Sequence, residues 1–299
     1  MKLTIIGSVA FDSVRTPFGQ REEVLGGSAT YASVSASFFA PVNLISVVGS
    51  DFSRKHIHIF KKRGIDISGL EIKKGKTFRW KAKYHYDFSG AETISTDLNV
   101  FEGFRPMITS NVTAGDNLLL ANIDPELQDW IFEKIRPKGL VACDTMNLWI
   151  EHKRKALLKL LKKVDIFLLN DAEARQLSGE TSLLDAARYI ASKGAKMIVI
   201  KKGEHGALFF SGDLRFIVPA YLLESIIDPT GAGDTFAGGM IGYLSKVSRV
   251  TDKALRRALV YGSILASFAV EKFSVEGLLR ATERDIGNRY KHFEKLTKF

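Results

Sequence analysis

The sequence predicts an α/β fold with a doubly wound, mainly parallel central sheet, and three observations support this prediction. Short apolar segments rich in β-branched residues alternate with longer segments of helical period. Two segments, about 11–25 and 76–100, break the alternation and contain no helical pattern. The length of 299 residues suits one large core. We therefore expect a single domain, 1–299, whose two exceptional segments form a small β-sheet lid.

The expected strands are short runs of apolar residues, and the expected helices fill the gaps between and after them. The strands are Leu3–Ile6, Asn43–Val48, Asn117–Ala121, Gly139–Cys143, Asp165–Leu169 and Met197–Ile200. The helices are Ser28–Phe39, Ser53–Lys62, Glu126–Ile135, Glu151–Lys162, Ser182–Ser192, Gly233–Leu244 and Asp252–Ala269. Strands and helices that alternate in this way imply crossover connections and a sheet covered on both faces.

The two exceptional segments differ from each other. Residues 11–25 are polar and are expected to be irregular, whereas 76–100 has the pattern of polar, aromatic-rich strands. In the second segment the larger apolar residues occupy alternate positions, which is the period of a strand with one covered face. These residues are Phe78, Trp80, Ala82, Tyr84 and Tyr86. A small sheet of this kind either covers a cleft or forms a dimer contact.

Composition and charge exclude several classes of protein. Hydrophobic residues make up 45% of the chain and charged residues 25%, as in ordinary globular proteins. The net charge of +10 suits a nucleic-acid surface, a membrane surface or a field that attracts anionic substrates, and it does not choose among them. The basic residues lie in short groups without an extended basic arm, which favours solvated surface charge, and we expect no nucleic-acid partner. The single cysteine, Cys143, excludes an intramolecular disulfide. No apolar run reaches membrane-spanning length or has the form of a signal peptide, so we expect a cytoplasmic protein that binds no membrane.

The strongest chemical signal is the segment Asp228–Gly239, DPTGAGDTFAGG, which opens a predicted helix. Gly231 and Gly233 leave room for backbone N–H groups to approach a phosphate, and the N-terminus of a helix favours an anion. Asp234 is either a first-turn acid that complements the helix dipole or a base that accepts a proton from an attacking hydroxyl. A carboxylate beside a phosphate would repel it unless it took part in the reaction, which favours the base.

Other phosphate and metal motifs are missing from the sequence. There is no Gly-x-x-x-x-Gly-Lys-[Ser/Thr] motif and no Gly-x-Gly-x-x-Gly after a strand, which excludes the usual P-loop and dinucleotide-binding enzymes. Protein-kinase motifs and paired Cys/His metal spacings are also missing.

The segment Asp228–Gly239 resembles the C-terminal signature of the ribokinase-like carbohydrate kinases, the PfkB family. Other segments of the chain resemble further motifs of that family, namely 7–12, 26–27, 48–51, 170–173 and 203–206. The resemblance covers most of the chain and implies a ribokinase-like fold. It also implies an ATP-dependent, magnesium-requiring sugar kinase that transfers the γ-phosphoryl group to a primary hydroxyl of a small carbohydrate.

The resemblance implies a role for each matching residue at the reacting centre and the substrate site. Asp234 would be the catalytic base, and the backbone of Gly231, Ala232 and Gly233 would stabilise the transferring phosphoryl group. Hydroxyls of the substrate would bind to Asp12, Gly26 and Gly27. Considered without the resemblance, Asp12 would be an ordinary turn residue after a strand, and the two glycines would form the turn that enters a helix.

The resemblance also implies residues for the nucleotide and the ions. Gly203 and Gly206 would border the nucleotide, and Asn170 and Glu173 would organise magnesium and phosphate, Glu173 through water. Asp228 and Thr230 match positions that hold a monovalent cation such as K⁺ in many members of the family. The alternative for Asn170 and Glu173 is an N-cap and a first-turn acid of a helix.

The chain departs from the family pattern at three places. Tyr31 stands where the double-glycine motif often has Asn, which puts ribose itself in doubt, although core packing is an equal explanation for a Tyr. Lys201 stands where the nucleotide-side motif commonly has Thr. A phosphate contact by Lys201 or Lys202 is one interpretation, and a solvated lysine at a strand end is the preferred one for either. Residues 144–147, DTMN, resemble the family's Asp-x-Asn region only loosely, so no role is assigned to them.

Two alternatives to a sugar kinase stay open. The family also contains nucleoside kinases of the adenosine and inosine-guanosine types, and the aromatic lid and Tyr31 favour one of them. From another class, the chain would be a non-catalytic protein that binds sugar or nucleic acid on the same fold. The expected partners are ATP and a small sugar or nucleoside, with a homodimer formed through the lid.

Overall fold

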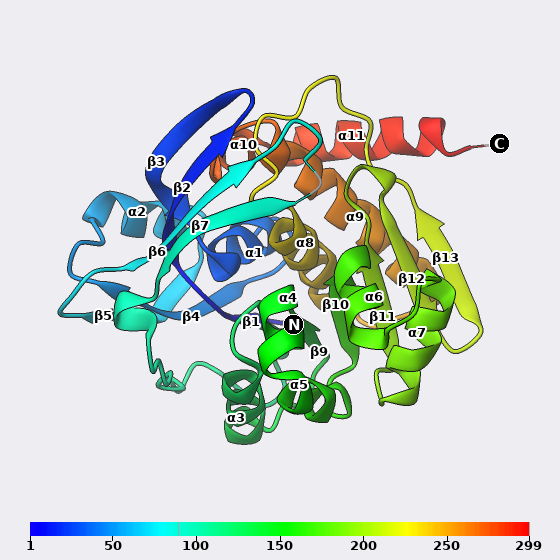
Figure 1. Cartoon of the computed structure of the whole chain (residues 1–299), viewed down its shortest axis with the longest axis horizontal. Helices are drawn as coiled ribbons and strands as arrows, with labels where there is room; N and C mark the ends of the chain where they lie inside the picture. The colour runs from blue at the N-terminus through cyan, green and yellow to red at the C-terminus, as the bar shows by residue number, and fades with distance from the viewer. Residues whose placement is uncertain (89, 299) are drawn as a thin grey trace.

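A nine-stranded sheet lies at the centre of the computed structural model, which describes residues 1–88 and 90–298 (Figure 1). From β5 to β11 every neighbouring pair of strands is parallel, and only β12 and β13 at one edge are antiparallel. The strands in spatial order are β13 (Leu214–Val218), β12 (Ala207–Ser211), β11 (Met197–Lys201), β10 (Ile166–Asn170), β9 (Val141–Asp144), β8 (Asn117–Leu120), β1 (Leu3–Ile6), β4 (Val42–Gly49) and β5 (Asp66–Lys73).

Helices cover both faces of this sheet, and each face has its own hydrophobic cluster. Side chains on successive residues of a strand point to opposite faces, so Ile5 joins one cluster and Ile6 the other. The helices on the first face are α1 (Ser28–Ala36), α2 (Arg54–Lys62), α8 (Ala232–Lys246), α9 (Asp252–Val270), α10 (Glu276–Arg280) and α11 (Glu283–Leu296). Those on the second face are α3 (Pro125–Ile135), α4 (Asn147–His152), α5 (Arg154–Leu161), α6 (Asp171–Ser178) and α7 (Leu183–Ser192).

A separate four-stranded sheet contains both segments that broke the α/β pattern, and it rises beside α1 and α8 in Figure 1. Its strands in spatial order are β3 (Gly19–Gly26), β2 (Ala10–Thr16), β6 (Phe78–Tyr84) and β7 (Ala91–Asp97). Two short 3₁₀ helices complete the elements, η1 (Asn99–Phe101) and η2 (Gly203–His205). Within the described part of the chain, the helices are too short or too polar to span a membrane.

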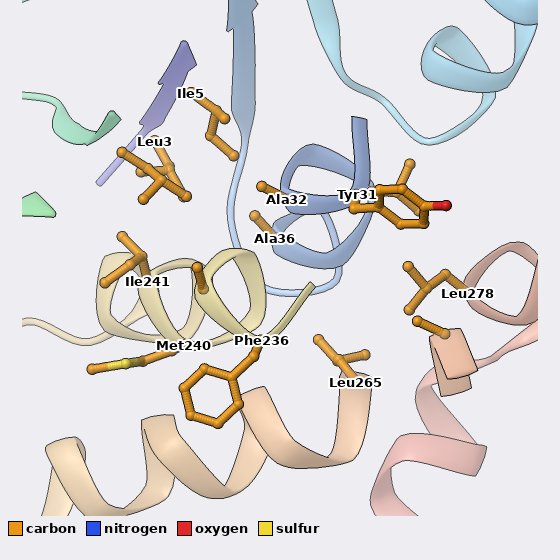
Figure 2. Close-up of a cluster of buried hydrophobic side chains, with 14 of the residues drawn as sticks. Leu3, Ile5, Tyr31, Ala32, Ala36, Phe236, Met240, Ile241, Leu265 and Leu278 are labelled. Atoms are coloured by element: carbon orange, nitrogen blue, oxygen red, sulfur yellow. The ribbon is translucent and has the colours of Figure 1, made fainter. Parts of the chain in front are cut away.

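Helix α1 packs closely against α8 because small residues line their contact. A methyl group added at Gly238 would lie 2.2 Å from the carbonyl oxygen of Ala32, and one at Gly242 would lie 2.8 Å from the Cα of Ala36. Figure 2 shows Ala32 and Ala36 facing the α8 cluster, whereas the hydroxyl of Tyr31 points away from it. This packing fixes the N-terminus of α8 beside the N-terminus of α1.

All six expected strands form, and their ends differ from the prediction by at most two residues. The expected helix Glu151–Lys162 is wrong as a single element, because Lys153 leaves the helical region (φ −128°) and separates α4 from α5. The segment 11–25 is a β-hairpin rather than irregular chain, and its polar residues Asp12 and Thr16 are buried on one face. Tyr86 lies beyond the end of β6 and is 83% exposed. That residues 1–299 form a single domain stays a prediction.

Candidate active site

The side chains with site chemistry gather where parallel strands end. Asp144, Asn170 and Lys201 are the last residues of β9, β10 and β11, which are parallel neighbours. Their carboxyl ends therefore meet at one edge of the sheet, the usual place for a ligand in an open α/β fold. The N-terminus of α8, with Asp234 in its first turn, reaches the same edge, because Asp234 interacts electrostatically with both Asp144 and Lys201.

The turn that enters α8 requires glycine at residue 231. Gly231 has φ +73°, a left-handed conformation that few other residues adopt without strain. An added methyl group there would also lie 2.4 Å from ring carbons of Tyr31. The N–H of Ala232 donates to the carbonyl of Pro229 at 3.1 Å, so this predicted anion donor already has a partner. Of the first-turn N–H groups that follow, that of Thr235 donates to the carbonyl of Gly231 at 2.8 Å and that of Asp234 lies against its own carboxylate, so the N–H of Gly233 is best placed to meet an anion.

Asp234 has the properties of a base that works near neutral pH. Burial raises the pKa of its carboxyl to about 7, with a further increase from the charge of Asp144 and a decrease from Lys201. Although helix caps commonly carry an acid in the first turn, such acids normally have low pKa values. The raised value favours a chemical role over simple dipole compensation.

Sequence reasoning missed an ion pair at this site. The ammonium of Lys201 donates to both carboxylate oxygens of Asp144, at 2.9 and 2.7 Å, and the two side chains are only 16% and 3% exposed. The interpretation of Lys201 as a solvated lysine is therefore wrong. Both residues end strands that had been predicted, and a polar residue in that place was the signal that would have found them.

Asn170 and Glu173 form the N-terminal cap of α6. The side chain of Asn170 accepts from the Glu173 N–H at 2.8 Å, and the carboxylate of Glu173 accepts from the Asn170 N–H at 2.7 Å. Burial raises the pKa of Glu173 to about 7, and Lys201 lowers it. The capping interpretation thus describes the contacts, and a further role in binding magnesium stays a prediction. Within residues 1–88 and 90–298, no three His, Cys, Asp or Glu side chains converge to hold a metal by themselves.

The predicted substrate residues lie together at the base of the small sheet. Asp12 on β2 packs so tightly against Gly26 that an added methyl group at Gly26 would lie 1.9 Å from its carboxylate. A backbone hydrogen bond from Gly27 lowers the pKa of Asp12, but burial outweighs it, and the charges of Asp228 and Asp234 assist, so the pKa rises to about 8. Double glycine therefore makes room for a buried carboxylate close to Asp228 and Asp234, on the turn that enters α8.

Two tyrosines lie beside this carboxylate. Tyr31 is 1% exposed, and its hydroxyl has no hydrogen-bond partner within the described residues. Tyr84 on β6 shares a hydrogen bond of 3.3 Å with the hydroxyl of Thr230, which joins the small sheet to the turn before α8. Both phenols interact electrostatically with Asp12 and Asp228, and the pKa of each is raised, mainly by burial.

The remaining predicted residues flank this centre. One carboxylate oxygen of Asp228 accepts from the Thr230 N–H at 2.9 Å, and the other is buried without a partner among the described residues. Gly203 and Gly206 lie in the turn between β11 and β12, directly after Lys201. Gly203 has open space around it, whereas Gly206 is closely packed against the carbonyl of Val218. Of these two glycines, Gly203 is the one with open space for a ligand beside it.

Comparison with known proteins agrees with this geometry. Residues 3–280 match the sequence profile described as pfkB family carbohydrate kinase. The chain belongs to this family. It is therefore a kinase, a phosphotransferase that uses an alcohol group as acceptor.

Individual members of the pfkB family show the extent of the similarity. A cytidine kinase of Thermococcus kodakarensis is 31% identical over 264 residues, which cover 87% of this chain and 94% of that protein. A ribokinase of Staphylococcus aureus is 32% identical over 312 residues, covering 94% and 97%. The solved structure of a putative ribokinase II from E. coli, in complex with ATP and Mg²⁺, superposes with a TM-score of 0.74 at 19% identity, covering 97% of this chain and 99% of that one. This last match confirms the ribokinase-like fold.

Proposed function

We propose that the protein is an ATP-dependent nucleoside kinase that phosphorylates the primary hydroxyl of the ribose unit. The observation that carries this proposal is the register of the small sheet, in which Asp12 of β2 pairs with Trp80 of β6. Paired residues of neighbouring strands project from the same face. A carboxylate for ribose hydroxyls therefore has an aromatic ring as its neighbour, and Tyr84 lies four residues further along the same face of β6.

An aromatic ring next to a hydroxyl-binding carboxylate suits a ligand with both a sugar and a flat base. Aromatic side chains stack on such rings with offset geometry, and Trp provides the largest stacking area. Trp80 is only partly exposed, and its indole N–H donates to Thr93 at 3.3 Å, which holds the ring in place. The similarity to a cytidine kinase supports the same substrate class.

In the proposed reaction, the substrate hydroxyl attacks the γ-phosphorus of ATP, the bond to the ADP oxygen breaks, and Asp234 accepts the hydroxyl proton. The N-terminus of α8, chiefly the N–H of Gly233, stabilises the charge of the transferring group. Asp12 holds the sugar so that its primary hydroxyl faces Asp234, and the small sheet excludes water from the centre. Positioning and charge stabilisation supply most of the rate, because phosphoryl transfer needs little covalent assistance from the protein.

The oxygen donors at the sheet edge fit a magnesium ion that is bound mainly through phosphate and water. Glu173 and Asn170 offer oxygens there, but their capping hydrogen bonds leave them poorly placed to surround an ion. Magnesium retains several waters when few protein ligands are available, and it would neutralise charge on the phosphates. The unpartnered oxygen of Asp228 beside Thr230 is similarly suited to a monovalent cation, and a K⁺ requirement is part of this proposal.

A sugar kinase, which the sequence patterns predicted first, is the second candidate. The ribokinase of Staphylococcus aureus is similar over nearly its whole length, and Asp12 with Gly26 would also bind a free sugar. Tyr31 in place of the usual Asn speaks against ribose. Its hydroxyl is buried and has no hydrogen-bond partner among the described residues.

The test is a substrate panel measured by ADP release with ATP, magnesium and potassium. The panel contains pyrimidine and purine nucleosides, ribose, other pentoses, hexoses and sugar phosphates, and the Asp234→Asn variant serves as the blank. A nucleoside is expected to give the highest kcat/KM, by at least about tenfold over ribose, which corresponds to about 1.4 kcal/mol from the base. A preference for a free sugar would reject the nucleoside proposal and select the second candidate.

A further inference from the structure

The proposed phosphoryl transfer uses Asp234, the N-terminus of α8 and Asp12, but not the buried ion pair between Lys201 and Asp144. Lys201 ends β11 next to Asn170 of β10, and Asp144 ends β9 on the other side of β10. Asp144 is 3% exposed, so it fixes the ammonium from the protein side, whereas Lys201 keeps 16% of its side chain accessible. The pair is thus anchored at one end and open at the other.

The ammonium of Lys201 lies next to the turn that enters α8. A methyl group built on Gly233 would lie 3.2 Å from the Lys201 nitrogen. The ammonium therefore occupies the space that a side chain at residue 233 would need. The N–H of Gly233 in this same turn is suited to a phosphoryl group. Glycine at residue 233 leaves the room that both the ammonium and an incoming anion need.

Lys201 is charged in this environment. Burial alone would lower the pKa of its ammonium, but the carboxylates of Asp144 and Glu173 raise it above the ordinary lysine value. An ammonium has three N–H donors, and among the described residues its two hydrogen bonds both go to Asp144. One donor therefore remains for a ligand on the accessible side.

The residues around this N–H donor are negatively charged, so a cation there would lower the repulsion that a phosphate meets. Asp144, Glu173 and Asp234 all interact electrostatically with Lys201, and ATP would bring further negative charge to the same edge. A fixed cation would offset this repulsion, most strongly when charge develops on the transferring group. The neutral Thr that is common at this place in the family carries no charge to do so.

We propose that Lys201 is a catalytic residue, whose ammonium donates its remaining hydrogen bond to the γ-phosphoryl group during transfer, while Asp144 acts as its positioning residue. The proposal rests on the proposed function only in requiring ATP as the phosphoryl donor, and it is independent of the acceptor. Arg in this place would keep the charge but change the geometry, so Lys201→Arg is expected to keep part of the activity.

The test compares Lys201→Met with Lys196→Met as a matched control. Lys196 precedes β11 at its opposite end and pairs with Asp165 at 2.7 Å, so both variants remove a lysine from a lysine–aspartate pair next to the same strand. Steady-state rates are measured with the best acceptor of the panel. Calorimetry then measures binding of magnesium–ADP with and without fluoroaluminate, which imitates the transferring phosphoryl group and needs no acceptor.

For Lys201→Met, kcat is expected to fall by about 10²–10³-fold, with the acceptor KM within about threefold of wild type. The tighter binding that fluoroaluminate gives to wild type is expected to be lost. Lys196→Met is expected to keep both properties. If Lys201→Met retains kcat within about threefold, or keeps the fluoroaluminate effect, the proposal is overturned.

A buried Asp144 without its partner is expected to cost stability, which would obscure the single variant. The double variant Asp144→Asn/Lys201→Met removes both charges, and its melting temperature is expected to return towards that of wild type. A folded double variant without turnover supports the proposal, and one with wild-type turnover rejects it. A wild type that is silent with nucleosides but binds the fluoroaluminate complex would reject the substrate class alone.

Discussion

At the scale of single residues, Asp234 and Lys201 place opposite charges next to the same turn of α8. Burial raises the pKa of Asp234 to about 7, Asp144 adds to the increase, and Lys201 opposes it. A general base is most effective when its pKa lies close to the working pH. The nearby ammonium therefore keeps the carboxylate ionised at a pH where burial alone would favour its protonated form.

Asp234→Asn is expected to lower turnover by about 10²-fold or more, because the amide cannot accept the hydroxyl proton. Wild-type kcat/KM is expected to fall as the pH decreases through about 7, since protonation of a carboxyl with a raised pKa removes the base. Initial rates on both sides of that pH, for the wild type, measure the effect. The assignment fails if a folded Asn variant keeps more than about a tenth of wild-type turnover.

At the scale of elements, the contact between α1 and α8 positions the turn that enters α8, residues 231–234, which we propose to be catalytic. Gly238 and Gly242 let the two helices approach, and Tyr31 on α1 then fills the space over Gly231. The position of the turn that we propose to bind the phosphoryl group is thus set by packing between two helices that are about 200 residues apart in sequence. A change in this contact is expected to affect catalysis and stability together.

Gly231→Ala is expected to cost more stability than Gly212→Ala, as measured by urea unfolding. Both glycines have positive φ, +73° and +57°, so each substitution carries a backbone cost of about 1–2 kcal/mol. Only the Gly231 variant also meets an obstacle, the Tyr31 ring at 2.4 Å, and overpacking adds about 1–3 kcal/mol. Equal losses in the two variants would show that the Tyr31 contact gives way without cost.

At the scale of the whole molecule, the small sheet meets the main body at the candidate active site. One face of β2 and β6 carries Asp12, Trp80 and Tyr84, and Tyr84 bonds Thr230 in the turn before α8. The other face of these strands carries charged residues such as Arg79 and Lys81. The first face is therefore suited to cover a substrate, and its function as a lid, or in a dimer, remains a prediction.

Tyr84→Phe is expected to raise the acceptor KM by about fivefold, because it removes one hydrogen bond worth about 1 kcal/mol between the small sheet and the catalytic turn. The melting temperature is expected to change little. Tyr189→Phe is the control, since its hydroxyl also takes part in a hydrogen bond, accepting from Arg154 at 2.9 Å, which joins α7 to α5. A variant with unchanged KM and lower stability would make the Tyr84 contact purely structural.

The parallel sheet, its strands and the Asp228–Gly239 turn could be predicted because each depends on residues close together in sequence. Apolar runs identified the strands within two residues, and the glycines of the turn identified an anion site before α8. The hairpin of β2 and β3 was missed because its covered face is made partly of polar residues such as Asp12 and Thr16. The break at Lys153 was missed because no Pro or Gly marks it.

The sequence by itself therefore determined the family and the α/β architecture, and it predicted Asp234 as the base. Only the tertiary structure decided which side chains share the site. Lys201 looked like a solvated lysine until the parallel strands placed it between Asp144 and the turn at Gly233. Tyr31 and Tyr84 likewise reached the site from a helix and from a separate sheet. Burial and charge at these positions depend on neighbours more than 50 residues away, and local sequence patterns do not encode such contacts.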